Sequence, residues 1–254
     1  MMYVLGDSFS FGHNFWQEKR LDRNELIYPH FLSQKLNCEV KNLSVPGGSN
    51  WRISRLLNNL NLNENDYVII GWTNVNRFEI GYNKTSLLPK DNLYTLEQLE
   101  ESTYEDDKNI IIHGFEKDKN VITAKLLPGL YHSTFDIIPN MPLKNLVSVT
   151  YQHFNNAEWL ENMFLVFFNS AVYKCLRARC KFIMFNVYWK THSTSCELLD
   201  IPEYFLGYNN NMTSFLRPNY KEKFTKYGMD YWSEDEHIQV AELLHSHLKK
   251  IYNS

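Results

Sequence analysis

The sequence predicts an α/β protein with a mainly parallel sheet. Three short apolar runs, at 2–5, 39–43 and 66–71, alternate with two segments of helical periodicity, and each run ends in a polar turn. Strands that alternate with helices form parallel sheets, because each helix carries the chain back to the same end of the sheet. We therefore predict a three-layer α/β/α sandwich whose polar turns share one edge.

The composition is that of a globular domain. The chain has 254 residues, of which 44% are hydrophobic and 22% are charged, as is ordinary for a protein with a real core. We expect one domain over 1–254 with an insertion, because α/β domains often reach this size. The net charge of −3 gives no basic surface for general nucleic-acid binding.

The cysteines and the apolar runs limit the cellular compartments in which the protein is expected. Cys38, Cys175, Cys180 and Cys196 form no C-x-x-C pair, so we expect reduced thiols, no metal site, no disulfide framework and no cofactor. No run is long enough to cross a bilayer, and the first strand leaves no room for a signal peptide. These observations predict a cytoplasmic protein that does not bind membranes. Frequent Asn, Lys and Ile are typical of AT-rich genomes, so a phage protein made in the host cytoplasm also fits.

The first half of the chain alternates regularly between strands and helices. Pro29 fits the first turn of one of these helices, and the Gly-rich loop at 44–50 precedes the next. The expected elements are the strand Met2–Leu5, the helix Tyr28–Leu36, the strand Glu39–Leu43, the helix Trp51–Leu60 and the strand Asp66–Gly71.

The second half is less regular. Periodicity is lost over about 79–145, and we interpret this segment as an insertion that covers one edge of the site. A broad apolar face predicts a long helix over Asn156–Arg179, followed by a strand over Lys181–Tyr188. After an irregular segment, Ser233 and Glu236 form the capping-box pattern that starts the last helix.

The turn Gly6-Asp7-Ser8, directly after the first strand, is the candidate reactive site. Ligands of open α/β sheets bind at the carboxyl ends of the strands. If a helix starts here, its free N–H groups favour negative charge beside Ser8. Ser8 is therefore a candidate nucleophile, and a serine that only caps the helix is the alternative.

Two more turns are expected at the same edge, Gly47-Gly48 and Thr73-Asn74. Acyl transfer requires a serine, a glycine whose N–H can approach an oxyanion, and a polar side chain that donates a further hydrogen bond. The three turns together supply these groups.

The same residues resemble the motifs of the SGNH (GDSL-like) hydrolase family. Gly6-Asp7-Ser8 is similar to the nucleophile block, and Asn42 followed by Gly47 is similar to the block that holds the oxyanion glycine. The segment 70–74 looks like the third block, but Thr73 stands where the family has Asn, and Asn74 follows one residue later. The resemblance covers the first third of the chain, looks like a branch common in phage and bacterial genomes, and implies a flavodoxin-like SGNH fold.

The resemblance implies a role for each matched residue. Ser8 would attack a carbonyl carbon, and the N–H groups of Ser8 and Gly47, with the side chain of Thr73 or Asn74, would hold the oxyanion. The implied substrate-binding residues are Asp7, Asn50, Arg77 and Tyr231.

The family's last block, an Asp and a His ahead of the final helix, is degenerate in this chain. Alignment on Trp232-Ser233 places Tyr231 at the position of the base. His237, oriented by Asp230 or by an acidic residue of the first helical turn, is one candidate base, and a packing histidine is its other interpretation. The other candidate bases are His113, His132 and His192.

Three functional hypotheses remain open at this point. The first is a serine hydrolase that cleaves an ester or acyl group on a small molecule, glycan or modified nucleotide. The second is a catalytically degenerate relative that binds a ligand or a protein partner through the same pocket. The third is an acyltransferase, in which a hydroxyl group replaces water. The oligomeric state is not predicted.

Overall fold

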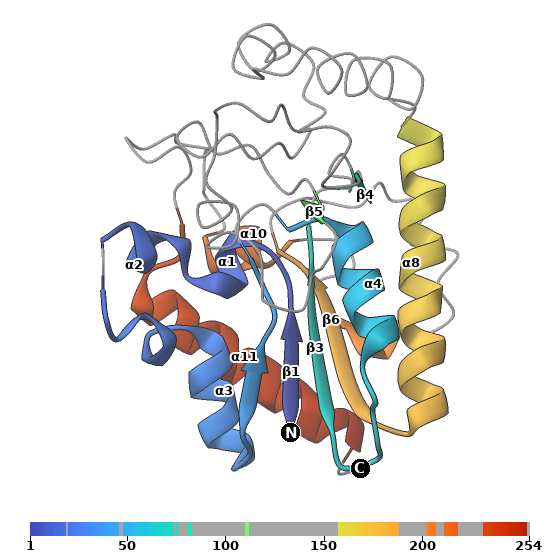
Figure 1. The fold of residues 1–254 in the computed structure, drawn as a ribbon. Coiled ribbons are helices and arrows are strands. Elements are labelled where there is room, and N and C mark those ends of the chain that lie inside the picture. Colours follow the sequence, from blue (N-terminus) through green and yellow to red (C-terminus); the bar gives the residue numbers. More distant parts are fainter. Residues whose placement is uncertain are drawn as a thin grey trace, which may run out of the picture.

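The chain forms an α/β fold around a five-stranded parallel sheet (Figure 1). This computed structural model describes residues 1–18, 20–45, 48–73, 75, 81–82, 110–111, 157–187, 202–206, 211–217 and 231–252. The strand order is β2-β1-β3-β6-β7. The strands are β1 (Met2–Leu5), β2 (Val40–Asn42), β3 (Tyr67–Trp72), β6 (Lys181–Asn186) and β7 (Phe205–Leu206). A separate antiparallel pair joins β4 (Gly81–Tyr82) to β5 (Ile110–Ile111).

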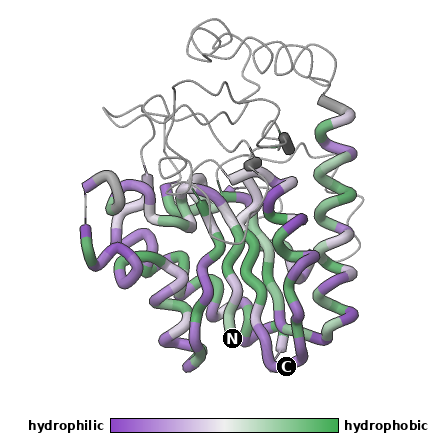
Figure 2. Tube along the Cα trace, viewed as in Figure 1, coloured by the Kyte–Doolittle hydropathy of each residue, from purple (hydrophilic) through white to green (hydrophobic). Residues whose placement is uncertain are grey.

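Helices pack against both faces of the sheet. Helices α3 (Tyr28–Leu36) and α11 (Glu234–Tyr252) lie on one side, and α4 (Asn50–Asn59) and α8 (Ala157–Ala178) lie on the other (Figure 1). Residues along β3 alternate between the two cores: Ile69 packs with residues of α3 and α11, whereas Val68 packs with residues of α4 and α8. Burial on both faces explains why β3 is a continuous apolar run, and Figure 2 shows hydrophobic residues along the central strands.

Short helices complete the described part of the chain. They are α1 (Ser8–Phe11), α2 (His13–Gln17), the 3₁₀ helices η1 (Arg23–Glu25) and η2 (Pro202–Tyr204), and α10 (Met212–Leu216). Helix α1 ends at Gly12, whose φ of 73° is in the left-handed region that glycine adopts most readily. A Cβ at position 12 would lie 2.4 Å from Ile27 Cγ2.

The expected α/β class and the expected regular elements are confirmed within the described residues. The strand over Met2–Leu5 and the helix over Tyr28–Leu36 have the predicted bounds, and the other predicted elements that are described differ by one to two residues at one or both ends. Helix α10 and strand β7 lie in a segment expected to be irregular. The expected insertion at 79–145 lies outside the described residues, apart from β4 and β5.

The sheet order places the candidate site at a topological switch point. Strand β2 pairs with one edge of β1, and β3 pairs with the other, so the chain passes from β1 to β2 on one side and then crosses over β1 to reach β3 on the other side. Ligands of such sheets bind outside the carboxyl ends of the strands where this reversal occurs. Here those ends are Leu5 of β1 and Trp72 of β3.

Candidate active site

The turn at the end of β1 holds Ser8 as the first residue of α1. Asp7, not Ser8, caps this helix: its backbone is extended, and its Oδ1 accepts the N–H of Phe9 at 3.1 Å. Gly6 is required because a Cβ there would lie 2.4 Å from Ser10 Oγ, directly beneath the turn. Ser8 is 3% exposed, and the described part of the chain offers its hydroxyl no hydrogen-bond partner.

Thr73, just beyond the end of β3, is joined to this turn. Its Oγ1 donates to Asp7 Oδ2 at 2.8 Å, and both side chains are buried. A threonine hydroxyl has one proton to donate. In this arrangement that proton goes to Asp7, so the Thr73 side chain does not donate to an oxyanion.

Asn50, the first residue of α4, contacts the backbone of Thr73 rather than open space. Its Oδ1 accepts the Thr73 N–H at 3.0 Å, and its Nδ2 donates to the Thr73 carbonyl at 3.0 Å. The preceding Gly48 packs against the same turn, since a Cβ at this position would lie 2.7 Å from the Gly6 carbonyl oxygen. The start of α4, the end of β3 and the turn at Ser8 therefore meet, as the parallel arrangement predicts.

His237 is enclosed between α11 and α3. It is 1% exposed, and its ring packs against Phe15, Tyr28 and Trp232. Its Nδ1 accepts the N–H of Tyr28 at 3.2 Å, so it caps the first turn of α3, whose own cap residue, Ile27, has no side-chain hydrogen bond. Burial lowers the pKa of His237 to about 3.

These contacts give His237 a structural role. In the neutral ring, Nδ1 accepts a proton and Nε2 therefore carries one. With Nδ1 occupied by Tyr28, neither nitrogen can take a proton from Ser8. The geometry matches the packing interpretation of His237 and not the interpretation as a base.

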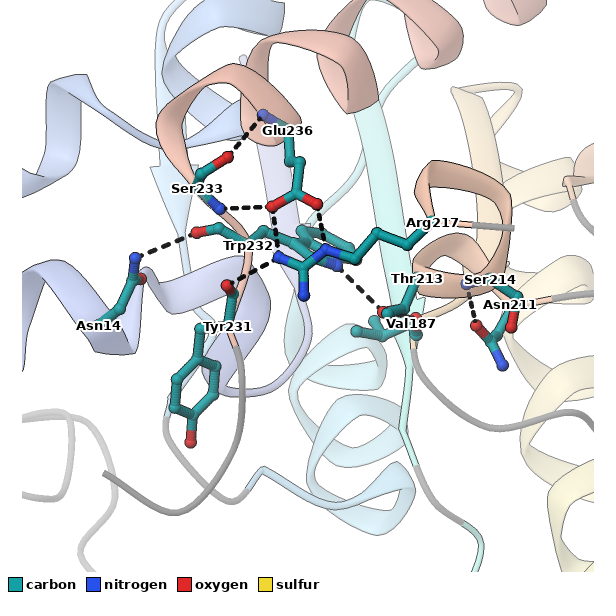
Figure 3. A network of polar contacts seen from close by, with 10 residues as sticks. All are labelled: Asn14, Val187, Asn211, Thr213, Ser214, Arg217, Tyr231, Trp232, Ser233 and Glu236. Carbon is teal, nitrogen blue, oxygen red and sulfur yellow. Dashed lines mark hydrogen bonds and ion pairs between the residues drawn. The ribbon is translucent and has the colours of Figure 1, made fainter. Parts of the chain in front are cut away.

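Tyr231 lies beside the helix that begins at Ser8. Its ring centroid is 5.1 Å from that of Phe9 and 5.1 Å from that of His13. A polar network fixes the backbone of this segment (Figure 3). Arg217 donates to the Tyr231 carbonyl at 3.2 Å and pairs with Glu236, which also accepts the N–H of Ser233 at 2.7 Å.

The same network joins Trp232 to its surroundings. The Trp232 Nε1 donates to Thr213 Oγ1 at 3.0 Å, and Thr213 Oγ1 in turn donates to the Val187 carbonyl at 3.0 Å. Asn14 Nδ2 donates to the Trp232 carbonyl at 3.0 Å. The capping box predicted at Ser233 and Glu236 is confirmed, since Ser233 Oγ also accepts the Glu236 N–H at 3.4 Å.

Several expected site residues lie outside the described residues. They are Gly47, Asn74, Arg77, Asp230, His113, His132 and His192.

Sequence reasoning missed a group of polar residues beneath the Ser8 turn. Tyr28 Oη donates to Ser10 Oγ at 2.9 Å, and Asn42 Nδ2 donates to the Ser10 carbonyl at 2.8 Å. Burial raises the pKa of Tyr28, so its hydroxyl stays protonated and remains a donor. Ser10 is 0% exposed, and the residues around it give no sign of this burial.

The described residues contain no cluster of three or more His, Cys, Asp or Glu side chains that could hold a metal ion. None of the helices in this part of the chain is long and apolar enough to cross a membrane. No protein-family model matches the chain, and neither a curated protein nor a solved structure was found to match it.

Proposed function

We propose that this protein is an SGNH-type serine hydrolase that cleaves an ester or acyl group on a small molecule, a glycan or a modified nucleotide. The proposal includes a three-layer sandwich of the flavodoxin-like type and, from the reduced cysteines, a cytoplasmic location. The observation that supports it is that Asp7 joins Thr73 to the first turn of α1, where Ser8 lies, at the switch point of the sheet. Ser8, which is 3% exposed, follows the carboxyl end of β1, beside the carboxyl end of β3.

In the proposed reaction, the Ser8 hydroxyl oxygen attacks the carbonyl carbon and its proton passes to a base. The carbonyl oxygen becomes an oxyanion, which the N–H groups of Ser8 and Gly47 and the side chain of Asn74 would hold. Thr73 is left out of this set because its proton is donated to Asp7. Collapse of the intermediate expels the alcohol or amine and leaves an acyl-serine, which water hydrolyses to regenerate Ser8.

The base is proposed to be a residue other than His237. His237 Nδ1 is occupied by the N–H of Tyr28, and its ring is enclosed by three aromatic residues. The remaining candidates are His113, His132 and His192, with Asp230 as a carboxylate near the start of α11. Each is tested by substitution to Asn, which removes a base without removing a polar side chain.

The experiment is labelling with a fluorophosphonate probe, in which the serine oxygen displaces fluoride from phosphorus and the base takes the serine proton. Wild-type protein is compared with Ser8→Ala, and the labelled peptide is identified by mass spectrometry. Labelling at residues within 1–18 that disappears in Ser8→Ala supports a hydrolase. Labelling elsewhere, or none, refutes it.

A second candidate function is ligand or partner binding without catalysis. Two observations support it. Tyr231 stands where the family's base is expected, and His237 Nδ1 accepts a hydrogen bond from the first residue of α3. Folded wild-type protein that resists the probe favours this function. An acyltransferase would label as a hydrolase does, and would then transfer the acyl group faster to an added alcohol than to water.

A further inference from the structure

A continuous series of hydrogen bonds runs from the start of α4 to the start of α1. Asn50 holds the N–H and the carbonyl of Thr73 at 3.0 Å each, and the Thr73 hydroxyl donates to Asp7 Oδ2 at 2.8 Å. Asp7 Oδ1 then accepts the N–H of Phe9, the residue after Ser8, at 3.1 Å. Asn50, Thr73 and Asp7 are 2%, 6% and 1% exposed, so solvent does not compete for these bonds.

Asn50 replaces a strand that is missing at this point of the sheet. Strand β1 pairs with β3 only as far as Leu5 and Ile70, whereas β3 continues beside β6 to Trp72. The Trp72 carbonyl accepts from Val187 on the β6 side, so the alternation of the strand directs the Thr73 groups toward β1. There β1 has already turned away, and the Asn50 amide satisfies both backbone groups.

The Asp7 carboxylate links the position of Thr73 to that of the Ser8 nucleophile. Its two oxygens have separate partners, the Phe9 N–H and the Thr73 hydroxyl, so a rotation of the carboxylate group breaks both bonds. Thr73 therefore fixes the orientation of the Asp7 side chain and, through it, the first turn of α1. Ser8 lies between Asp7 and Phe9, and its direction depends on this turn.

We infer that Asn50 and Thr73 are positioning residues for the Ser8 nucleophile, an inference that rests on the proposed hydrolase function. Asn50 belongs to the support of the site and not to the substrate pocket, because both polar atoms of its side chain are bonded to Thr73. An interaction that only stabilises the fold changes the fraction of folded protein. A positioning interaction also changes the reactivity of the molecules that are folded.

The test compares fluorophosphonate labelling rates of folded protein. Thr73→Val removes the hydroxyl at nearly constant volume, and we expect it to lower the rate about ten- to a hundredfold, because small displacements of reacting groups are costly. Thr73→Ser restores the hydroxyl, and we expect a rate within about threefold of wild type. Asn50→Leu should lower the rate at least as much as Thr73→Val; if it does not fold, Thr73→Val decides alone.

Tyr252→Phe is the matched control. The Tyr252 hydroxyl accepts the Phe182 N–H at 2.9 Å and donates to the Phe182 carbonyl at 3.1 Å, near the first residue of β6. The Tyr252→Phe protein therefore lacks one hydroxyl and two hydrogen bonds, and these lie at the opposite end of the sheet from Ser8. We expect its labelling rate to equal that of wild type. A Thr73→Val rate equal to wild type, or an equal loss in Tyr252→Phe, overturns the inference.

Hydrogen exchange of the peptide at 5–12 separates this inference from the proposed function. If wild-type protein is not labelled, the hydrolase proposal fails, and exchange then decides the positioning. Faster exchange of 5–12 in Thr73→Val than in Tyr252→Phe supports the coupling of Thr73 to the Ser8 turn. Equal exchange in wild type and Thr73→Val overturns it.

Discussion

The enclosed His237 predicts a specific dependence of stability on pH. Its pKa falls from the ordinary value of 6.5 to about 3 in the folded protein, because burial penalises the charged ring. The unfolded chain therefore binds more protons than the folded protein at every pH between these two values. The stabilisation is fully present above pH 6.5 and is lost as the pH falls through this window.

The size of the effect follows from the shift. Each pH unit below the unfolded pKa costs up to about 1.4 kcal/mol, and pH 5 lies 1.5 units below 6.5. Allowing for partial protonation near pH 7, wild-type protein should lose about 2 kcal/mol of unfolding free energy through His237 between pH 7 and pH 5. In His237→Asn, the amide oxygen can still accept the Tyr28 N–H, but nothing titrates.

The assay is urea unfolding, followed by circular dichroism, at pH 5, 6, 7 and 8. We expect the unfolding free energy of wild type, relative to that of His237→Asn, to fall by about 2 kcal/mol between pH 7 and pH 5, because only wild type carries the titrating ring. Leu244→Ala, a truncation on the buried face of the same helix, controls for destabilisation and should run parallel to wild type. If His237→Asn also runs parallel to wild type, the ring is not held neutral, and His237 must be reconsidered as a base.

Three further predictions concern stability and are read from urea unfolding at pH 7. Gly48→Ala should cost about 1–3 kcal/mol, because the new Cβ lies 2.7 Å from the Gly6 carbonyl oxygen; an unchanged midpoint would contradict this packing. Gly12→Ala should cost at least about 1 kcal/mol from its φ of 73° alone, and a neutral result would contradict that conformation. Arg217→Met should cost about 1–3 kcal/mol, because it leaves the partly buried Glu236 carboxylate without its ion pair; Lys at the same position should recover part of the loss.

The regular elements could be predicted because local and tertiary preferences agree in them. In α3, the apolar spacing, Pro29 in the first turn and the left-handed Asn37 at the end all specify the same helix. Strand β7 has two residues and α10 has five. Such short elements carry no measurable periodicity and are determined by pairing with β6 and by contacts with α11, which the sequence does not display.

The meeting of Ser8 with Thr73 could be predicted because the carboxyl ends of parallel strands lie at one edge. The roles of individual side chains could not. Asn50 is polar and close to the site, so its position in the sequence predicts a contact with substrate. Its amide instead bonds the backbone N–H and carbonyl of Thr73, which lie beyond the last residue pair of β1 and β3 because β1 ends at Leu5. The need of these two groups for a partner arises only when the end of β1, the end of β3 and the start of α4 come together. The residues around position 50 therefore do not reveal it.

His237 did leave a signal. It lies four residues before Ala241 and seven before Leu244, on the stripe that packs against α3. A histidine in register with buried apolar residues is better interpreted as part of the core than as a base.

The packing of Trp232 on Phe9 has a consequence for how the protein matures during translation. The two rings, 5.0 Å apart between centroids, belong to segments separated by more than two hundred residues. A ribosome that has synthesised β1, β2 and β3 has therefore not yet synthesised Trp232, which packs in the core against the helix that begins at Ser8. The nascent polypeptide cannot complete the packing around Phe9 until the segment at 231–252 has left the exit tunnel.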